Sequence, residues 1–256
     1  MHLNNADIDM LHGPLTKKLL LFTLPIALSS IIQLKLCLNK TGLSFSITKQ
    51  ILKSGIPSAM QGAVFCFANI FVQASINTFG ETAIAGSTIA MNFEYFTYYV
   101  ITAFGQTATT FTSQNFAARQ KARCKKIFWL CLLLSAVCSS VLIFAVVLFR
   151  NFFAGIFSHE QMVIESAALR ILCILLFEPI CNLYEIPAGV LRGSGRAVYP
   201  AVCTMIGTCV FRIVWICTVF EKYQTLSVLY YAFPLSWVVN VLLMCTGFII
   251  MRRSLY

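Results

Sequence analysis

Residues 105–126 read GQTATTFTSQNFAARQKARCKK, and the boundary inside this stretch organises the rest of the chain. A weakly polar, helix-like segment runs here into a cluster of cationic residues. Five of them fall within eight positions: Arg119, Lys121, Arg123, Lys125 and Lys126. Long apolar segments with almost no charge lie on both sides. A basic loop between two hydrophobic segments is typical of the cytoplasmic side of a membrane protein.

The composition supports the same interpretation. Hydrophobic residues fill 59% of the 256 positions and charged residues only 11%, whereas soluble domains carry about 25% charged residues. The mean hydropathy is +0.81. The net charge of +10 comes from short clusters between apolar runs. We therefore expect positive-inside loops, a lipid bilayer as the surroundings and no nucleic-acid partner.

The cysteines and histidines do not follow a pattern typical of a metal or redox site. Most of the eleven cysteines lie inside apolar segments, and no Cys-x-x-Cys pair occurs. Cys124, Cys131 and Cys138 recur every seven residues, which predicts one helical stripe of small buried side chains. The spans also lack a nucleophile elbow and a phosphate-binding glycine loop. We therefore expect no metal, no organic cofactor and no enzymatic activity.

Several apolar segments are long enough to cross a membrane, and helices satisfy backbone groups in lipid. The predicted spans are 55–79, 83–111, 127–149, 163–191, 198–220 and 226–251. The predicted fold class is therefore all-α, a polytopic six-helix transmembrane bundle over residues 55–256. Lysines and arginines mark alternate connections, so we expect a multi-pass protein of the cell membrane with both ends cytoplasmic.

Residues 1–54 form a separate predicted region, in which a short apolar helix is followed by a basic connector. The apolar run 19–34 is shorter than the roughly 20 residues that a spanning helix needs, and Pro25 interrupts it. If it crossed the membrane, the six-span topology would be inverted. We therefore expect this helix to lie in the interface or to re-enter. A cleavable signal peptide is the alternative, although no clear Ala-x-Ala site follows.

Charged residues inside the predicted spans are few, and each is costly at membrane depth unless it faces a cavity or a partner. Glu178 and Arg212 lie equally far from Gly195 in the turn at 193–195, so antiparallel helices carry them to one depth. We predict a buried ion pair between them, which either fixes helix register or couples transport. Glu165 and Arg170 are expected to be solvated near the outer end.

Two further acids are candidates for holding a cation or a substrate charge. Glu185 lies seven residues after Glu178, on the same helical face. Pro179 and Pro187 interrupt that helix beside each acid, and carbonyls freed by proline near a carboxylate suit a cation site or a hinge. An ordinary proline kink is the alternative. Glu94, in the second span, is the third acidic candidate.

Polar side chains on the first two spans are candidates for lining a cavity. Asn69, Gln73 and Asn77 fall on one helical face. The second span adds Asn92 and Tyr95 near one depth. Interhelical hydrogen bonds that hold the bundle together without a cavity are the alternative.

A series of motifs resembles the carboxy-terminal half of the multidrug and toxic compound extrusion (MATE) transporters. Gly55-Ile56-Pro57 opens a span, and residues 113–119 (SQNFAAR) stand where the family has a G-Q-N-x-G-A pattern. Phe79-Gly80, residues 83–86 (AIAG) and residues 191–195 (LRGSG) followed by Pro200 also match. Residues 13–34 are similar to the entry and first-helix start of the family. Because members have two six-helix lobes, the chain resembles a transporter that lacks most of its first lobe.

The resemblance implies export of organic, often cationic, compounds driven by inward movement of sodium ions or protons. Glu94 matches an acid found in the second span of many members. Where NorM-type members carry acids in the first and fourth spans, this chain has Phe65 and Cys181, with Glu178 one turn away. The family motifs assign the inner end of the lobe to Gln114, Asn115, Arg192, Gly193 and Gly195.

Alternating access requires two lobes, so a single lobe is expected to associate with itself or with a second lobe. Two other functions remain open from the sequence. One is a truncated membrane fragment that does not transport. The other is a flippase for a lipid or polysaccharide precursor, as in related exporter folds.

Overall fold

The computed structural model describes the backbone of residues 45–255 and the side chains of residues 56 and 59–250. Within this part the chain is helical and contains no strand. The predicted all-α fold class is confirmed. The predicted apolar helix 19–34 lies outside the described residues.

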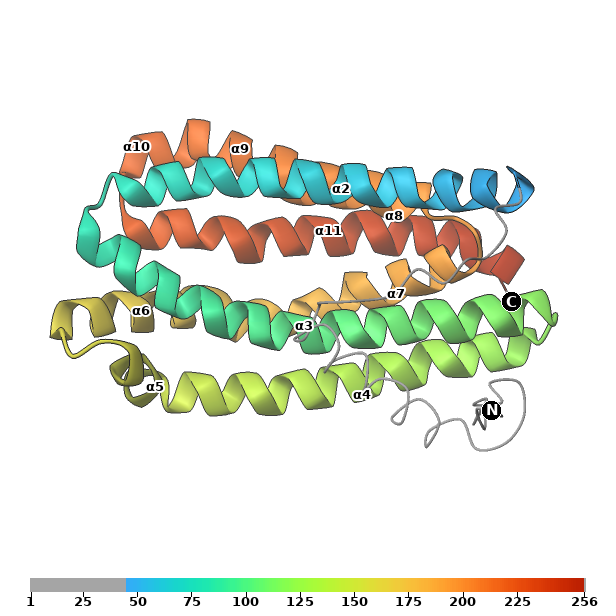
Figure 1. Ribbon diagram of the computed structural model, residues 1–256, viewed down its shortest axis with the longest axis horizontal. Helices are drawn as coiled ribbons and strands as arrows, with labels where there is room; N and C mark the ends of the chain where they lie inside the picture. Colours follow the sequence, from blue (N-terminus) through green and yellow to red (C-terminus); the bar gives the residue numbers. More distant parts are fainter. Residues whose placement is uncertain (1–44, 256) are drawn as a thin grey trace, which may run out of the picture.

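Six helical rods run back and forth along the long axis of the molecule (Figure 1). The first three are α2 (Phe45–Asn77), α3 (Glu81–Ala117) and α4 (Lys121–Leu148), and a short helix α5 (Arg150–Phe157) follows. α2 begins ten residues before the predicted start at Gly55. α5 lies within a connection that the sequence predicted between spans.

The fourth and fifth rods change their helical type along their length. The fourth consists of α6 (Gln161–Ile174), the 3-10 segment η1 (Leu175–Cys181) and α7 (Asn182–Gly193). The fifth consists of α8 (Val198–Thr204), the π-helical segment η2 (Met205–Val210), α9 (Phe211–Trp215), the π-helical segment η3 (Ile216–Phe220) and α10 (Glu221–Tyr223). The sixth rod is α11 (Leu226–Leu255). Pro179 lies inside η1, where its missing N–H disturbs the α-helical hydrogen bonding.

Four of the described stretches are long and apolar enough to cross a membrane. They are Ala59–Asn77, Lys121–Leu148, Val198–Tyr223 and Leu226–Ile250. α3 is more polar, and it packs against α4, α6 and α7. A single helix can therefore be polar within the bundle because its neighbours cover it.

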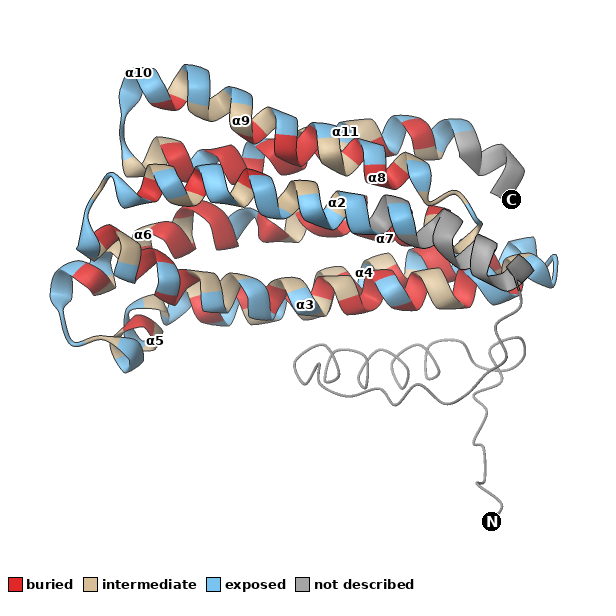
Figure 2. Cartoon of the chain, turned by 45° about the horizontal axis from the view of Figure 1, so that its top comes forward, coloured by how far each residue is buried: buried red, intermediate tan, exposed pale blue. Residues whose placement is uncertain are grey.

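The outward face of α4 shows why the bundle requires an apolar solvent. Its exposed large side chains recur every three or four residues and form one stripe: Trp129, Leu133, Val137, Val141, Phe144 and Leu148. Cys124 and Cys131 are buried on the opposite side, and Cys138 is half-buried. Figure 2 shows buried and exposed residues alternating along the helices of the bundle. A continuous exposed apolar face of this kind is costly in water but matches lipid chains.

α3 and α7 approach each other closely because glycines lie at their crossing. A Cβ on Gly189 would stand 2.4 Å from the carbonyl oxygen of Gly105, and one on Gly193 would stand 2.4 Å from that of Thr109. Only the absence of a side chain permits this backbone contact. The crossing holds the fourth rod against the second, and this places Glu178 beside α3.

Candidate functional site

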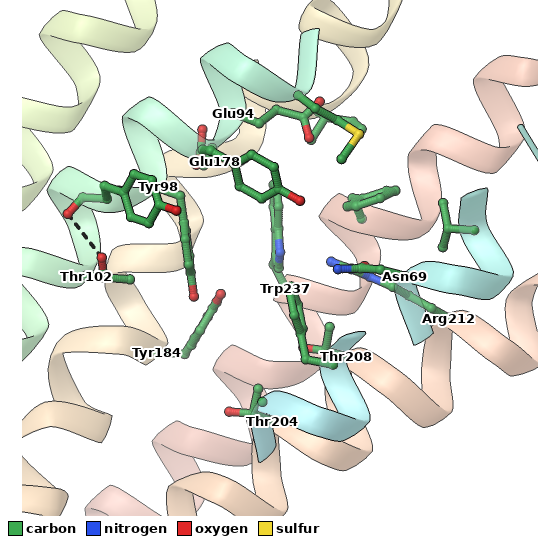
Figure 3. A pocket seen from close by; sticks show the side chains of 18 of the residues that line it. Asn69, Glu94, Tyr98, Thr102, Glu178, Tyr184, Thr204, Thr208, Arg212 and Trp237 are labelled. Carbon is green, nitrogen blue, oxygen red and sulfur yellow. Dashed lines mark hydrogen bonds between the residues drawn. The ribbon is translucent and has the colours of Figure 1, made fainter. Parts of the chain in front are cut away.

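A cavity of about 610 Å³ opens between the rods (Figure 3). Cavities of roughly 300–1,000 Å³ with apolar walls and a few polar groups are typical of small-molecule sites. α2 and α3 each contribute one helical face, and the fourth, fifth and sixth rods complete the wall. The polar and charged lining residues are Gln61, Asn69, Gln73, Glu94, Thr102, Gln106, Arg170, Glu178, Thr204, Thr208 and Arg212. The aromatic ones are Phe65, Tyr95, Tyr98, Tyr99, Tyr184, Phe233 and Trp237.

Arg170 and Glu94 form a closed ion pair in the wall of this cavity. The Arg170 Nε lies 2.6 Å from Oε1 of Glu94, and its Nη2 donates to Oε2 at 2.9 Å. Its Nη1 donates to the Ser87 hydroxyl at 2.7 Å, and that hydroxyl lies 3.1 Å from the Tyr230 hydroxyl. The guanidinium therefore has a bidentate carboxylate and a further acceptor, which is its strongest arrangement.

The expectation that Arg170 is solvated was wrong. Its exposed fraction is 2%, because α6 packs against α3 and brings Arg170 to the level of Glu94. These two residues are 76 positions apart. The sequence carried a signal for this pair, since the cost of a charge at membrane depth applies to Arg170 as it does to the acids.

Glu178 is 2% exposed and lies in the 3-10 segment beside Pro179. Its Oε2 accepts a hydrogen bond from the Thr97 hydroxyl at 2.5 Å. The predicted ion pair with Arg212 is not formed, although both residues line the cavity. Depth alone does not decide pairing, because η1 turns Glu178 toward α3 and Thr97.

Arg212 is 1% exposed and its partners are neutral. Its Nε donates to the Ser236 hydroxyl and its Nη1 to Oδ1 of Asn69, each at 3.2 Å. The guanidinium carbon lies 4.0 Å from the ring centre of Phe233 and 5.7 Å from that of Phe65. No carboxylate among the described residues forms an ion pair with it. Figure 3 shows Arg212 beside Asn69, with Glu94 and Glu178 on another side of the cavity.

Of the other residues predicted to line a cavity, some do so in the structure and some lie outside it. Asn69, Gln73 and Tyr95 line the cavity. Asn77 is exposed and accepts a hydrogen bond from Gln73 at 2.9 Å, while Asn92 is exposed and donates to the Thr88 carbonyl at 3.1 Å. Neither Asn77 nor Asn92 belongs to the lining.

Glu185, another of the acidic candidates, lies in α7 away from the cavity lining. Its Oε1 accepts a hydrogen bond from Nη2 of Arg192 at 2.5 Å. A Cβ on Gly105 would stand 3.0 Å from the Glu185 side chain, so the carboxylate is enclosed between α3 and α7. This arrangement links the acid to the inner-end motif.

The predicted inner-end residues lie at the turns where α3 and α7 end. Asn115 is buried, and its Oδ1 accepts a hydrogen bond from Nε of Arg123 at 3.1 Å. Gln114 is exposed, and its carbonyl accepts the Ala118 N–H that ends α3. Gly195 has a φ of 85°, in the left-handed region that favours glycine after a helix. These residues shape the connections rather than the cavity.

Several lining residues were not singled out from the sequence, among them Tyr184, Thr208 and Trp237. Aromatic and threonine side chains are common in membrane helices, so their type alone carries no signal for a cavity. Only the rotation of each rod decides which of them face inward.

The chain resembles known proteins both in sequence and in fold. Residues 57–218 match the family model described as MatE. A protein of Thermotoga maritima called "Probable multidrug resistance protein NorM" is 28% identical over 170 residues, which are 63% of this chain and 35% of that protein. A protein of Mannheimia succiniciproducens with the same name is 26% identical over 149 residues, or 57% of this chain and 31% of its own length. The chain thus spans about a third of the length of these curated relatives.

A solved structure shares the fold. It is titled "Outward-facing conformation of a multidrug resistance MATE family transporter of the MOP superfamily", and it superimposes with a TM-score of 0.75 at 16% identity. The match covers 93% of this chain and 55% of the other. The described bundle therefore has the architecture of about half of that protein.

Proposed function

The chain belongs to the MatE family, and on that premise we propose that it serves in the cation-coupled export of small organic compounds across a membrane. Proteins of this family are multi-pass membrane transporters and not enzymes. The observation that carries the proposal is the cavity of about 610 Å³, which combines aromatic walls with buried charged groups. Such a cavity gives an organic compound both apolar contact and a few orienting polar groups.

We propose Glu178 as the acid that binds the coupling ion. Among the described lining residues, Glu94 is already held by Arg170, whereas the partner of Glu178 is the neutral Thr97 hydroxyl. A buried carboxylate without a cationic partner gains most from a proton or a sodium ion. A cationic substrate, as the family resemblance predicts, would meet the same carboxylate.

Transport further requires an orientation and a second lobe. We propose that both ends of the described bundle face the cytoplasm, because the cations of 119–126 and Arg192 lie at the end where α3 and α7 finish. We also propose that the lobe pairs with a second copy of itself, since alternating access moves one lobe against another.

The experiment measures the movement of a cationic dye across vesicles that contain the full chain. A sodium gradient is imposed in one arm and a proton gradient in the other. We expect gradient-dependent movement that is lost in Glu178→Gln. The matched control is Glu165→Gln, because Glu165 is an acid outside the cavity whose described partner is Gln161. The arm that supports movement identifies the coupling ion.

If the inserted and folded chain moves no dye under either gradient, the proposal fails. The chain would then be a membrane fragment that does not transport by itself. If Glu178→Gln and Glu165→Gln move dye equally well, transport stands but Glu178 is not the coupling acid.

A further inference from the structure

Arg212 has charge and hydrogen-bonding capacity that the described protein does not use fully. A guanidinium has five N–H donors, and two hydrogen bonds, to Ser236 and Asn69, satisfy Nε and one donor of Nη1. Nη2 has no acceptor among the described residues, and Arg212 lines the cavity without being sealed from it. A bound ligand can therefore reach this group.

The electrostatic surroundings of Arg212 favour an anionic ligand. A buried charge is costly unless an opposite charge or several hydrogen bonds compensate it. Arg212 has two neutral oxygen partners and the faces of Phe233 and Phe65, which compensate a cation only in part. Arg170, which is buried to the same degree, has a bidentate carboxylate.

The neighbours of Arg212 supply the rest of a binding site. Asn69 accepts the Arg212 hydrogen bond through Oδ1, and its amide N–H groups have no acceptor among the described residues, so they can donate to an anion. Phe65, Phe233 and Trp237 line the cavity around these two residues. An arginine fork binds carboxylate, sulfonate or phosphate oxygens with two parallel hydrogen bonds, and aromatic walls accept an apolar body.

We propose that this cavity binds small organic compounds through an anionic group held by Arg212 and Asn69, with the apolar part of the compound against Phe65, Phe233 and Trp237. This rests on the proposed function only in taking the cavity as the substrate site. It changes the expected substrate from a purely cationic compound to an anionic or zwitterionic one. Glu178 is then left for the coupling ion.

The test compares three probes that share one aromatic body: 2-naphthoate, 2-naphthamide and 2-naphthylmethylammonium. The full chain is placed in nanodiscs of zwitterionic lipid, so that the membrane itself favours neither charge, and binding is measured by equilibrium dialysis. We expect naphthoate to bind about tenfold or more tighter than the amide, since charge-assisted bidentate pairs are the strong ones. Naphthoate that binds no tighter than the amide, or ammonium that binds tightest, would overturn the proposal.

Variants locate the effect. Arg212→Gln is expected to bring naphthoate binding down to the level of the amide and to leave the amide unchanged, while Arg212→Lys keeps part of the preference. Arg150→Gln is the matched control, because Arg150 contacts the Val147 carbonyl and lies outside the cavity. If Arg212→Gln still prefers naphthoate as the wild type does, the assignment is wrong.

Asn69→Asp keeps the proposal testable if the arginine variants do not fold. A carboxylate at this position lies next to the retained Arg212 and competes with an incoming anion, so naphthoate binding should fall by tenfold or more, about the strength of one charge-assisted pair. Unchanged naphthoate binding in folded Asn69→Asp contradicts the proposal. Dialysis measures binding without a gradient, so the two proposals can fail separately. A chain that binds naphthoate but moves no dye refutes the proposed transport and leaves the proposed binding site standing.

Discussion

Two buried arginines, Arg170 and Arg212, have exposed fractions of 2% and 1%, yet they occupy different electrostatic surroundings. Arg170 lies in α6 and faces α3, with a bidentate carboxylate, a hydroxyl and two aromatic faces as partners. Arg212 lies in α9 with an amide, a hydroxyl and aromatic faces, and without a carboxylate. The charge of Arg170 is compensated by the protein itself, whereas the charge of Arg212 is available to a ligand that enters the cavity.

This difference distinguishes an arginine that stabilises the bundle from an arginine that is available to a ligand, although both line the same cavity. A charge that only holds helices together is best neutralised on the spot, because removing the partner of a buried ion leaves a large penalty. A charge that must meet a ligand has to keep donors available. Burial by itself therefore says little about the role of an arginine, and the nature of its partners says more.

The largest expected effect comes from breaking the closed pair. Arg170→Met and Glu94→Gln should each lower the free energy of unfolding by about 3–5 kcal/mol, because each leaves one buried charge without its counter-charge. The double variant should lose much less than the sum. The measurement is denaturant unfolding of the full chain in mixed micelles. Additive losses would mean that Arg170 and Glu94 do not stabilise each other.

The next effect tests the crossing of α3 and α7, which holds the rod that carries Arg170 against the rod that carries Glu94. Gly189→Ala should lower the free energy of unfolding by about 1–3 kcal/mol, since the new Cβ meets the Gly105 carbonyl oxygen at 2.4 Å. Gly62→Ala is the matched control, because a Cβ added at Gly62 would have nothing within 4 Å. This helical glycine lines the cavity, and its replacement by alanine should be neutral or stabilising by up to about 1 kcal/mol. Equal losses in both variants would contradict the close crossing of α3 and α7.

A smaller effect is expected from Arg212→Gln. The variant loses two hydrogen bonds from a charged donor, but it also removes a buried positive charge that has no carboxylate partner. These two effects oppose each other, so the free energy of unfolding should change by less than about 2 kcal/mol. The same unfolding assay compares this variant with Arg170→Met. If Arg212→Gln costs as much as Arg170→Met, both arginines are structural and the contrast between them disappears.

The smallest expected effect concerns Glu178 and Arg212. Since Glu178 accepts from Thr97 and Arg212 donates to Asn69 and Ser236, their double-mutant cycle should show a coupling energy below about 0.5 kcal/mol, as for independent sites. Glu178→Gln, Arg212→Gln and the double variant supply the cycle. A coupling above about 1 kcal/mol would restore the ion pair that their common depth suggested.

Much of the fold could be predicted because its determinants are local. The apolar length of each segment, the five cations of 119–126 and the seven-residue spacing of Cys124 and Cys131 are read directly along the chain. The MATE motifs are also short and consecutive. The 3-10 and π-helical segments were not predicted, since a small change in hydrogen-bonding pattern within a helix hardly alters hydropathy.

The candidate site was predicted less completely. The acids Glu94 and Glu178 and the carboxamides Asn69 and Gln73 line the cavity, whereas Asn77, Asn92 and Glu185 do not. Helical spacing groups residues on a face, but it does not say which way that face is turned. Sequence symmetry about the 193–195 turn brought Glu178 and Arg212 to one cavity and still did not pair them.

The sequence by itself determined that this chain is a membrane-embedded helical bundle of the MATE kind, because hydropathy, charge position and family motifs are properties of segments. Only the tertiary structure decided which charges meet. Arg170 finds Glu94 across 76 positions because α6 packs against α3, while Arg212 reaches Asn69 across 143 positions and finds no carboxylate among the described residues. Pairing depends on which helices are neighbours and how each is rotated, and this is fixed by packing between distant segments.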